Sequence, residues 1–100
     1  MNFEIAPKST EIESNWDDAK LYCFALNIDG KTGWRLPTKK ELWILKESEN
    51  DFDIRWYWSS TENENCDNIA WCYYGGVTGG VGYNFKDNNS ICVRAVRSID

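Results

Sequence analysis

The side chains best suited to nucleophilic or metal chemistry in this chain are four cysteines, and no histidine accompanies them. They stand 43, 6 and 20 positions apart, at Cys23, Cys66, Cys72 and Cys92. None of these spacings is the C-x-x-C of a zinc knuckle, and a thiolate nucleophile would lack an imidazole base. Four cysteines permit three disulfide pairings, and the sequence does not choose among them. We expect free, mostly buried thiols, with no metal and no cofactor.

Oxygen-bearing side chains are the other candidates for catalysis. Glu41 is a candidate general acid, residues 59–61 (SST) offer hydroxyl nucleophiles, and residues 62–67 hold three carboxylates close in sequence. Hydroxyls in a strand usually form structural hydrogen bonds, and acids in a polar loop are usually solvated. The glycine-rich residues 75–82 lack the lysine and the following helix of a phosphate loop. We therefore expect a protein that is not an enzyme.

The stretch GWRLPTKKEL, residues 33–42, predicts a corner between a strand and a helix. Pro37 forces Leu36 towards extended geometry, so Trp34, Arg35 and Leu36 should be extended. Thr38 is a helix N-cap and Glu41 stands three residues later, which is the spacing of a reciprocal capping box. Both side chains then have a structural role, and this interpretation is preferred to catalysis by Glu41.

The remaining pattern predicts helices followed by antiparallel strands, an α+β layout in one domain spanning residues 1–100. Ser14 or Asn15 caps a first helix with an apolar stripe at residues 16, 19, 23 and 26, and Gly30 takes a positive φ after its end. Glycines 75, 76, 79 and 80 mark hairpin turns, and residues 87–90 form a polar turn. The other expected elements are an edge strand Phe3–Ile5, a second helix to about Ser48 with Leu42, Ile44 and Leu45 buried, and strands Trp56–Thr61, Ile69–Tyr74, Val81–Phe85 and Ile91–Val96.

Three arginines are expected to form ion pairs rather than to contact a ligand. In the last strand, residues 91, 93 and 95 give an apolar face, and Arg94 shares the mixed face with residues 92 and 96. Arg35 and Arg97 likewise stand beside apolar residues. Glu41 and Glu62 are the expected partners.

The composition excludes several classes of partner. The chain has 100 residues, 42% of them hydrophobic, and six tryptophans, most of which we expect in the core, with Trp34, Trp58 and Trp71 structural. A net charge of −5 argues against nucleic acid. No apolar run approaches the roughly 20 residues that cross a membrane. Residues 1–14 lack the basic and apolar regions of a signal peptide, so a cytoplasmic location is expected for the chain as encoded.

Five ordered blocks of this sequence resemble the C-terminal domain of Lcl-type bacterial collagen-like adhesins, a family found widely in bacterial and phage proteins. The resemblance covers residues 14–97. Its blocks are Trp16–Cys23, Gly33–Thr38 with Glu41-Leu42, Tyr57–Glu62, Ala70-Trp71 and Val93–Arg97. The RLPT-x-x-E corner alone is also similar to formylglycine-generating enzymes.

The resemblance implies a C-type-lectin-like fold, with two helices packed on a twisted antiparallel sheet. Related domains act as adhesins, sugar binders and variable ligand-binding ends. This chain departs from them in three ways. It has no Glu-Pro-Asn, Gln-Pro-Asp or Trp-Asn-Asp triplet for calcium-dependent sugar binding, no collagen-like repeat, and no counterpart of the formylglycine-generating cysteine pair.

Residues 62–90 carry the mixture of aromatic rings, amides and glycines that recognition surfaces use. By strand alternation, Tyr73 and Tyr74 face opposite sides, and Tyr83 and Phe85 share a face that Asn84 does not. The residues predicted to lie on or near the ligand surface are Tyr74, Tyr83, Asn84, Asp87 and Asn88.

The sequence therefore favours a non-catalytic recognition module that binds a protein or a glycan, such as a phage-encoded protein that engages a host factor. A phage-borne chain would be virion- or host-associated. A glycan site should show a shallow aromatic platform flanked by Asn and Asp, whereas a protein site should be flatter, larger and mixed. The alternatives are an oligomeric adhesin or structural subunit that binds polysaccharide, and a small enzyme related to formylglycine-generating enzymes.

Overall fold

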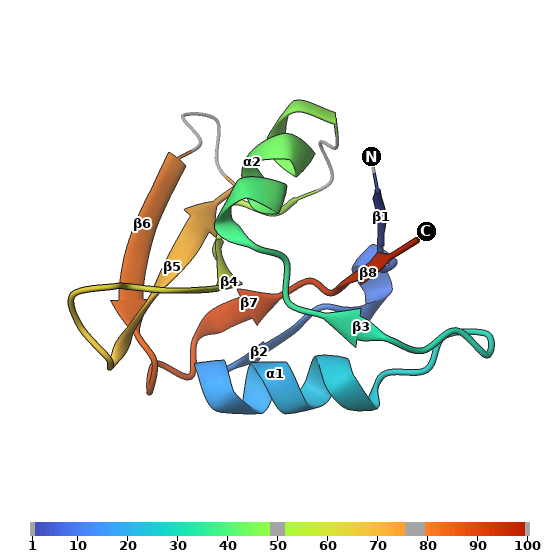
Figure 1. Cartoon of the computed structure of the whole chain (residues 1–100), viewed down its shortest axis with the longest axis horizontal. Coiled ribbons are helices and arrows are strands. Elements are labelled where there is room, and N and C mark those ends of the chain that lie inside the picture. The colour runs from blue at the N-terminus through green and yellow to red at the C-terminus, as the bar shows by residue number, and fades with distance from the viewer. Residues whose placement is uncertain (1, 49–51, 76–79, 100) are drawn as a thin grey trace.

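The structure, a computed structural model, describes residues 2–48, 52–75 and 80–99, and within these residues it contains two helices and two sheets (Figure 1). It is an α+β architecture, as expected. In chain order the elements are β1 (Phe3–Ile5), the 3₁₀ turn η1 (Lys8–Thr10), β2 (Ile12–Ser14), α1 (Trp16–Ala25), β3 (Trp34–Arg35), α2 (Lys39–Ser48), β4 (Trp56–Glu62), β5 (Ile69–Tyr74), β6 (Gly80–Phe85), β7 (Ile91–Val93) and β8 (Val96–Ser98).

The two sheets have the strand orders β2-β7-β4-β5-β6 and β1-β8-β3. β1 is an edge strand, as predicted. The expectation of a purely antiparallel sheet is wrong at one pair, because β4 and β7 run parallel, with Tyr57 opposite Cys92. The helices lie on opposite sides of the larger sheet: α1 contacts β2 and β4, whereas α2 contacts β4 and β5 (Figure 1).

Helix α1 begins and packs as its sequence predicts. The Asn15 side chain accepts a hydrogen bond from the Asp18 backbone N–H at 2.9 Å, which satisfies a free amide of the first turn. Trp16, Ala19 and Cys23 are buried against the sheet. The outer side of α1 is not purely polar, since Phe24 is 83% exposed. No described helix is long and apolar enough to span a bilayer.

The corner before α2 is the predicted capping box. Thr38 Oγ1 accepts from the Glu41 N–H at 3.0 Å, and Glu41 Oε1 accepts from the Thr38 N–H at 2.9 Å. Leu42 and Leu45, both in α2, are buried, as expected. The expectation for Ile44 is wrong, because it is exposed. At about 100° per residue, Ile44 points roughly 200° away from Leu42, so both cannot face the sheet.

The chain end differs from the single strand predicted for Ile91–Val96. It forms two strands, β7 and β8, which belong to different sheets. Between them, the Ala95 carbonyl accepts from the Ala6 N–H at 2.9 Å, which fixes the crossing point. Residues 91–96 are all buried, because the segment passes between the two sheets, so the expected division into an apolar and a mixed face is wrong.

Adjacent residues of β4 supply two separate cores. Trp58 joins the cluster on the α1 side, together with Trp34 and Cys23. Tyr57 joins the cluster on the α2 side, together with Leu42. The alternation of a strand therefore lets one central element anchor both helices.

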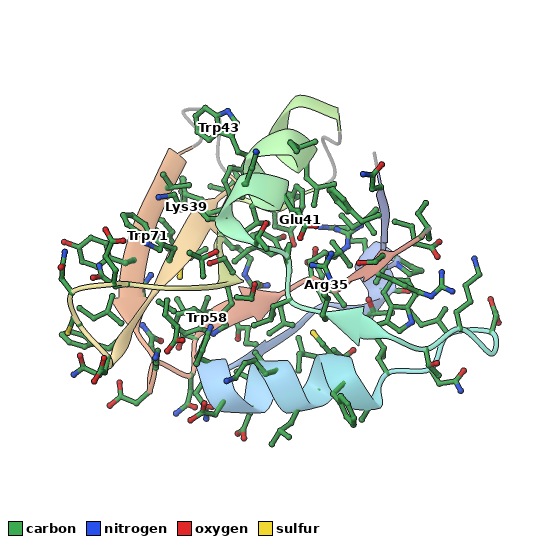
Figure 2. All side chains as sticks on the ribbon, in the orientation of Figure 1. Arg35, Lys39, Glu41, Trp43, Trp58 and Trp71 are labelled. Carbon is green, nitrogen blue, oxygen red and sulfur yellow. The ribbon has the colours of Figure 1, made fainter. Side chains whose placement is uncertain are left out.

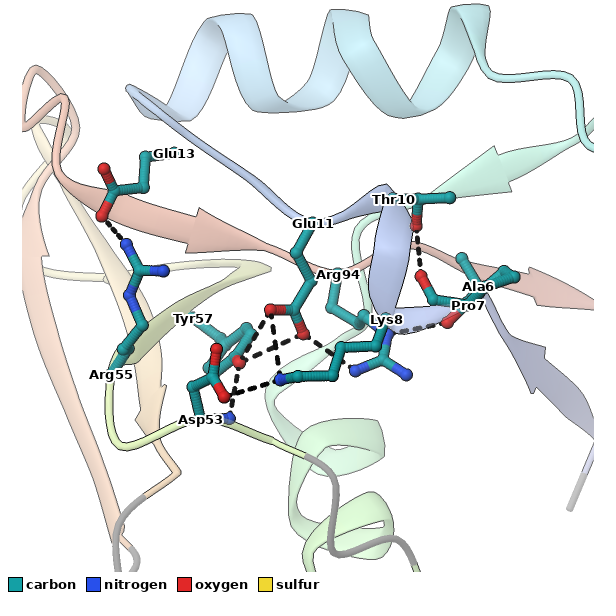
Figure 3. A network of polar contacts seen from close by, with 10 residues as sticks. All are labelled: Ala6, Pro7, Lys8, Thr10, Glu11, Glu13, Asp53, Arg55, Tyr57 and Arg94. Atoms are coloured by element: carbon teal, nitrogen blue, oxygen red, sulfur yellow. Dashed lines mark hydrogen bonds and ion pairs between the residues drawn. The ribbon is translucent and has the colours of Figure 1, made fainter.

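A buried ion network attaches the N-terminal segment to the sheet (Figure 3). Arg94 donates to the Ala6 carbonyl at 2.7 Å and to the Glu11 carboxylate at 2.8 Å. The Tyr57 hydroxyl contacts the same carboxylate, at 3.1 and 3.2 Å from its two oxygens, and accepts from the Asp53 N–H. Glu11 and Arg94 are almost fully buried, so these contacts are needed to offset the free-energy cost of removing their charges from water.

The glycine-rich hairpin is described only at its ends. Of the glycines expected in turns, Gly76 and Gly79 lie outside the described residues, and Gly80 begins β6. A Cβ on Gly75 would lie 2.3 Å from the Asp53 carbonyl oxygen, so this close backbone approach requires glycine. The polar turn is confirmed: Asn88 Oδ1 accepts from the Ser90 N–H at 2.9 Å.

Candidate functional site

The face of the β5–β6 hairpin that lies on the α2 side carries a row of partly exposed aromatic residues. Trp71 in β5 stands directly opposite Tyr83 in β6, and Ile69 stands opposite Phe85. The Trp71 and Tyr83 rings meet edge to face, with centroids 5.4 Å apart and planes at 90°. Tyr83 is 55% exposed and Phe85 60%, so this face of the hairpin is open. Tyr83 and Phe85 share it, as strand alternation predicted.

Helix α2 contributes a cation to this row. Its first residue, Lys39, places Nζ 3.8 Å from the centroid of the Trp71 ring. The Lys39 backbone N–H donates to Thr61 Oγ1 at 3.0 Å, which ties the start of the helix to the end of β4. Figure 2 shows Lys39 and Trp71 close together between α2 and the β5–β6 hairpin, with Trp43 above them. Tyr83, Trp71 and Lys39 thus form one continuous contact series from β6 to α2.

A shallow groove of about 410 Å³ follows this series between α2 and β6. Trp43, which is 47% exposed, and Val81 supply its apolar walls, and two lysines stand at its rim. The lining residues are Thr38, Lys39, Lys40, Trp43, Thr61 and Val81. We call this surface, together with Trp71 and Tyr83, the α2–β6 groove. It offers an apolar anchor site beside positive charge.

A second concavity is larger and polar. It measures about 760 Å³ and lies where the N-terminus of α1 meets the turn after β6. Phe85, the last residue of β6, is among its lining residues, and the Trp16 ring is buried, with Lys20 and Lys86 Nζ 3.8 and 4.3 Å from its centroid. We call it the polar hollow; its other lining residues are Asn15, Asp17, Asp18, Asp67, Asn68, Asp87 and Asn89.

The five residues predicted to bind a ligand do not form one surface. Tyr83 lies on the face of the α2–β6 groove. Tyr74 and Asn84 lie on the opposite face of the hairpin, where Tyr74 packs on Trp56 with ring centroids 5.2 Å apart. Asp87 lines the polar hollow, and Asn88 serves the adjacent turn. The structure therefore divides these residues among three places.

Tyr74 and Asn84 are separated from Tyr83 by strand alternation. Ala70 and Cys72 in β5 lie on the same face of the hairpin as Tyr74 and Asn84, and they belong to the core on the α1 side. Burial raises the pKa of the Cys72 thiol to about 11, although hydrogen bonding to Asn84 opposes the rise. Asn84 thus contacts the edge of the core.

The residues predicted to be structural are placed as follows. Trp34 and Trp58 are buried, and their indole N–H groups donate to the Lys31 and Ser14 carbonyls. Trp71 is half-buried within the aromatic row. Arg35, Thr38 and Glu41 form the corner and Arg94 the buried network.

Arginine pairing is confirmed, but two of the partners differ from those expected. Arg35 holds Glu41 with two hydrogen bonds of 2.7 and 2.8 Å. Arg94 pairs with Glu11 and Arg97 with Glu4, because β1 and β2 lie beside the chain end. Glu62 instead binds Lys86 at 2.6 Å.

The groups with catalytic potential are engaged in structural contacts. Both Glu41 oxygens are taken up by Arg35, and one also accepts from Thr38, which together lower the pKa of this carboxyl. Burial raises the pKa of the Cys23 thiol to about 12. All four cysteines are free, and three of them are buried, as predicted. Among the described residues, no His, Cys, Asp and Glu side chains gather in a group able to hold a metal ion.

Sequence reasoning missed Lys39 and Trp43. They stand four residues apart on α2, so they share one side of the helix. The buried stripe is set by Leu42 and Leu45, which already places Trp43 away from it. An exposed tryptophan one turn after a lysine was therefore a signal available in the sequence.

One comparison with known proteins gives a match to a family. The family model described as the Lcl C-terminal domain matches residues 4–97, which is nearly the whole chain. No curated protein and no solved structure gives a significant match. The matched range includes both helices and every described strand, and it leaves out only Phe3 of β1 and Ser98 of β8, so the match covers the fold that carries the α2–β6 groove. The chain belongs to the Lcl C-terminal domain family.

Proposed function

We propose that this domain is a non-catalytic recognition module of C-type-lectin-like fold that binds a protein ligand in the α2–β6 groove. The observation that carries the proposal is the continuous series of Tyr83, Trp71 and Lys39 beside the apolar walls of Trp43 and Val81. Family membership is compatible with a recognition role.

The chemistry of the groove favours a protein over a sugar. Trp43 and Val81 offer apolar contact area, and aromatic residues of this kind often dominate the binding energy of protein interfaces. Lysines, rather than the amides and carboxylates that bind sugar hydroxyls, border these walls. A ligand segment with an apolar side chain for the groove fits this surface.

The local charge further specifies the ligand. The whole chain has a net charge of −5, whereas the groove presents Lys39 and Lys40. A carboxylate next to the apolar anchor would meet this positive rim, while an evenly acidic partner would be repelled by the rest of the surface. We infer that the ligand carries an acidic residue adjacent to its apolar anchor.

The engaged state of the reactive groups supports a non-catalytic role. Glu41 is held by Arg35 and Thr38, and the raised pKa values of Cys23 and Cys72 keep these thiols protonated at neutral pH. A general acid needs a mobile proton and a nucleophilic cysteine needs its thiolate. These groups are better suited to holding the scaffold.

The polar hollow favours a second candidate function, binding of a glycan. Phe85, at the end of β6, lines it together with side chains such as Asp18, Asp87 and Asn89, which is the aromatic-plus-amide chemistry expected for sugars. Its buried Trp16 ring offers no stacking face, so the platform is smaller than that of the α2–β6 groove. We therefore rank this function second.

The test is capture from a bacterial lysate and probing of a glycan array with three immobilised proteins. These are the unaltered chain, Trp43→Ala in the groove, and Asp87→Ala in the hollow. The proposal predicts a captured protein whose binding is lost with Trp43→Ala and kept with Asp87→Ala. Glycan binding that fails only with Asp87→Ala would establish the second candidate and reject the first.

A further inference from the structure

Strand β6 is an outer edge of the five-stranded sheet, and nothing among the described residues pairs with its far side. Its six residues pair with β5 in an unbroken register from Gly80–Tyr74 to Phe85–Ile69. Edge strands are usually protected by a charge, a proline, a bulge or extreme shortness. The sequence of β6, GVGYNF, has none of these features. An unprotected edge of this kind is suited to strand pairing.

The outward backbone groups of β6 follow from its hydrogen bonds to β5. The Lys86 N–H, one residue past the strand, donates to the Asn68 carbonyl on the β5 side at 2.8 Å. In an antiparallel ladder, residues alternate between pointing toward and away from the neighbouring strand. The N–H and C=O groups of Val81 and Tyr83 therefore point outward from the sheet, as does the Phe85 N–H.

We propose that β6 pairs antiparallel with β6 of a second copy of this chain, with the two Tyr83 residues opposite each other at a twofold axis. In this register Val81 lies opposite the partner's Phe85, and Gly82 lies opposite the partner's Asn84. The two Tyr83 residues then exchange a pair of hydrogen bonds at the axis, and each Phe85 N–H meets the partner's Val81 carbonyl. Each Val81 N–H meets the partner's Phe85 carbonyl, which also accepts from its own Asn88 N–H. The interface is isologous, which is the usual form of a homodimer.

Two observations favour a second copy over a strand of another protein. First, the segment is complementary to itself, because the exposed side chains of Val81, Tyr83 and Phe85 lie on one face and become cross-strand neighbours. Second, residues 80–85 are uncharged in a chain of net charge −5, so two copies meet here without placing like charges opposite each other. The dimer joins two five-stranded sheets into one and places two aromatic rows side by side, which would allow bivalent binding.

The first experiment measures the mass of the full chain by light scattering and analytical ultracentrifugation over a concentration series. A concentration-dependent dimer is expected. Tyr83→Lys should weaken dimerisation by tenfold or more, because two like charges then meet at the axis. Phe24→Lys, on the outer side of α1, is the matched control and should leave the dimer unchanged. A monomer at every concentration, or a dimer insensitive to Tyr83→Lys, would overturn the proposal.

A charge exchange tests the register itself. Val81→Lys or Phe85→Glu alone should weaken the dimer. The double variant should restore it, because the two substituted positions face each other across the interface and then carry opposite charges. Failure of the double variant to recover, with an unchanged circular dichroism spectrum, contradicts this pairing.

Hydrogen exchange supplies a measurement without substitutions. The Val81 and Tyr83 amides should exchange more slowly as the concentration rises, while the Phe24 amide inside α1 should not respond. Concentration-independent exchange at both β6 amides rules the pairing out.

Discussion

Lys39 Nζ lies 3.8 Å from the centroid of the Trp71 ring, and Lys20 Nζ lies at the same distance from the Trp16 ring. The two contacts are geometrically alike, but they occupy different surfaces. Lys39 borders the α2–β6 groove, whereas Lys20 stands on α1. The molecule therefore carries its own internal control for the role of the groove lysine.

This pair gives the first prediction. Lys39→Met keeps the aliphatic stem over Trp71 but removes the charge that an acidic ligand would meet. Affinity for the captured partner should fall about tenfold, with a weaker dependence on salt, while stability changes by about 1 kcal/mol or less. Lys20→Met should change stability similarly and leave binding unaffected. Isothermal titration at two salt concentrations measures the affinity of both variants. Equal losses of affinity in Lys39→Met and Lys20→Met would contradict the role of Lys39 in the groove.

The buried network gives the second prediction. Arg94→Met leaves the Glu11 carboxylate buried without its main partner, so unfolding free energy should fall by about 3 kcal/mol or more. Glu11→Leu combined with Arg94→Met removes both charges and should recover much of that loss. Urea unfolding of the unaltered chain, Glu11→Leu, Arg94→Met and the double variant measures the four free energies. A double variant as unstable as the sum of the single ones would show that the two residues are not coupled.

The corner gives a prediction about pH. Arg35 and the Thr38 N–H lower the pKa of Glu41 below its ordinary value of 4.5, so the unfolded state binds the proton more readily. The stabilisation from this carboxylate is complete above about pH 4.5 and is lost as pH falls through the lower pKa of the folded state.

Glu41→Gln should therefore cost roughly 1 kcal/mol at neutral pH and progressively less below pH 4.5. Glutamine keeps the capping acceptor, so the pH dependence isolates the charge. Thermal unfolding between pH 3 and pH 7 provides the measurement. Glu64→Gln, in an exposed loop, is the control. If the loss of stability in Glu41→Gln grew as the pH falls, the link between this loss and the lowered pKa of Glu41 would be contradicted.

The thiols give the fourth prediction. Cys23 and Cys72 are buried and their pKa values are raised to about 12 and about 11, and burial also raises the pKa of Cys92. At pH 8 a thiol reagent should label Cys66 quickly and these three slowly. In urea without reductant all four should react. A missing thiol in urea would reveal a disulfide, and fast labelling of the Cys66→Ser variant would show that the core is open.

Local rules predicted much of the fold from the sequence. The capping box at Thr38 and Glu41 and the cap at Asn15 involve neighbours in the chain, so spacing alone identifies them. The break after Val93 and the parallel pairing of β4 with β7 depend on where distant segments lie. Such placements are tertiary, and no pattern within residues 91–96 encodes them.

The candidate site was less predictable for the same reason. Alternation correctly put Tyr83 and Phe85 on one face, but the sequence could not show that α2 would bring Lys39 and Trp43 beside that face. Tyr74 and Asn84 were grouped with Tyr83 by composition, although strand geometry turns them to the other side. Composition finds a region, whereas the assembly of elements decides which side chains share a surface.

The central claim is that ligand binding occurs at the α2–β6 groove, and the indole N–H signals of the six tryptophans test it most directly. Titration of the isotope-labelled chain with the captured partner should shift the indole signals of Trp43 and Trp71. Those of the buried Trp34 and Trp58 should stay in place. Shifts confined to Trp16, beside the polar hollow, or no indole shift at saturation, would contradict the account.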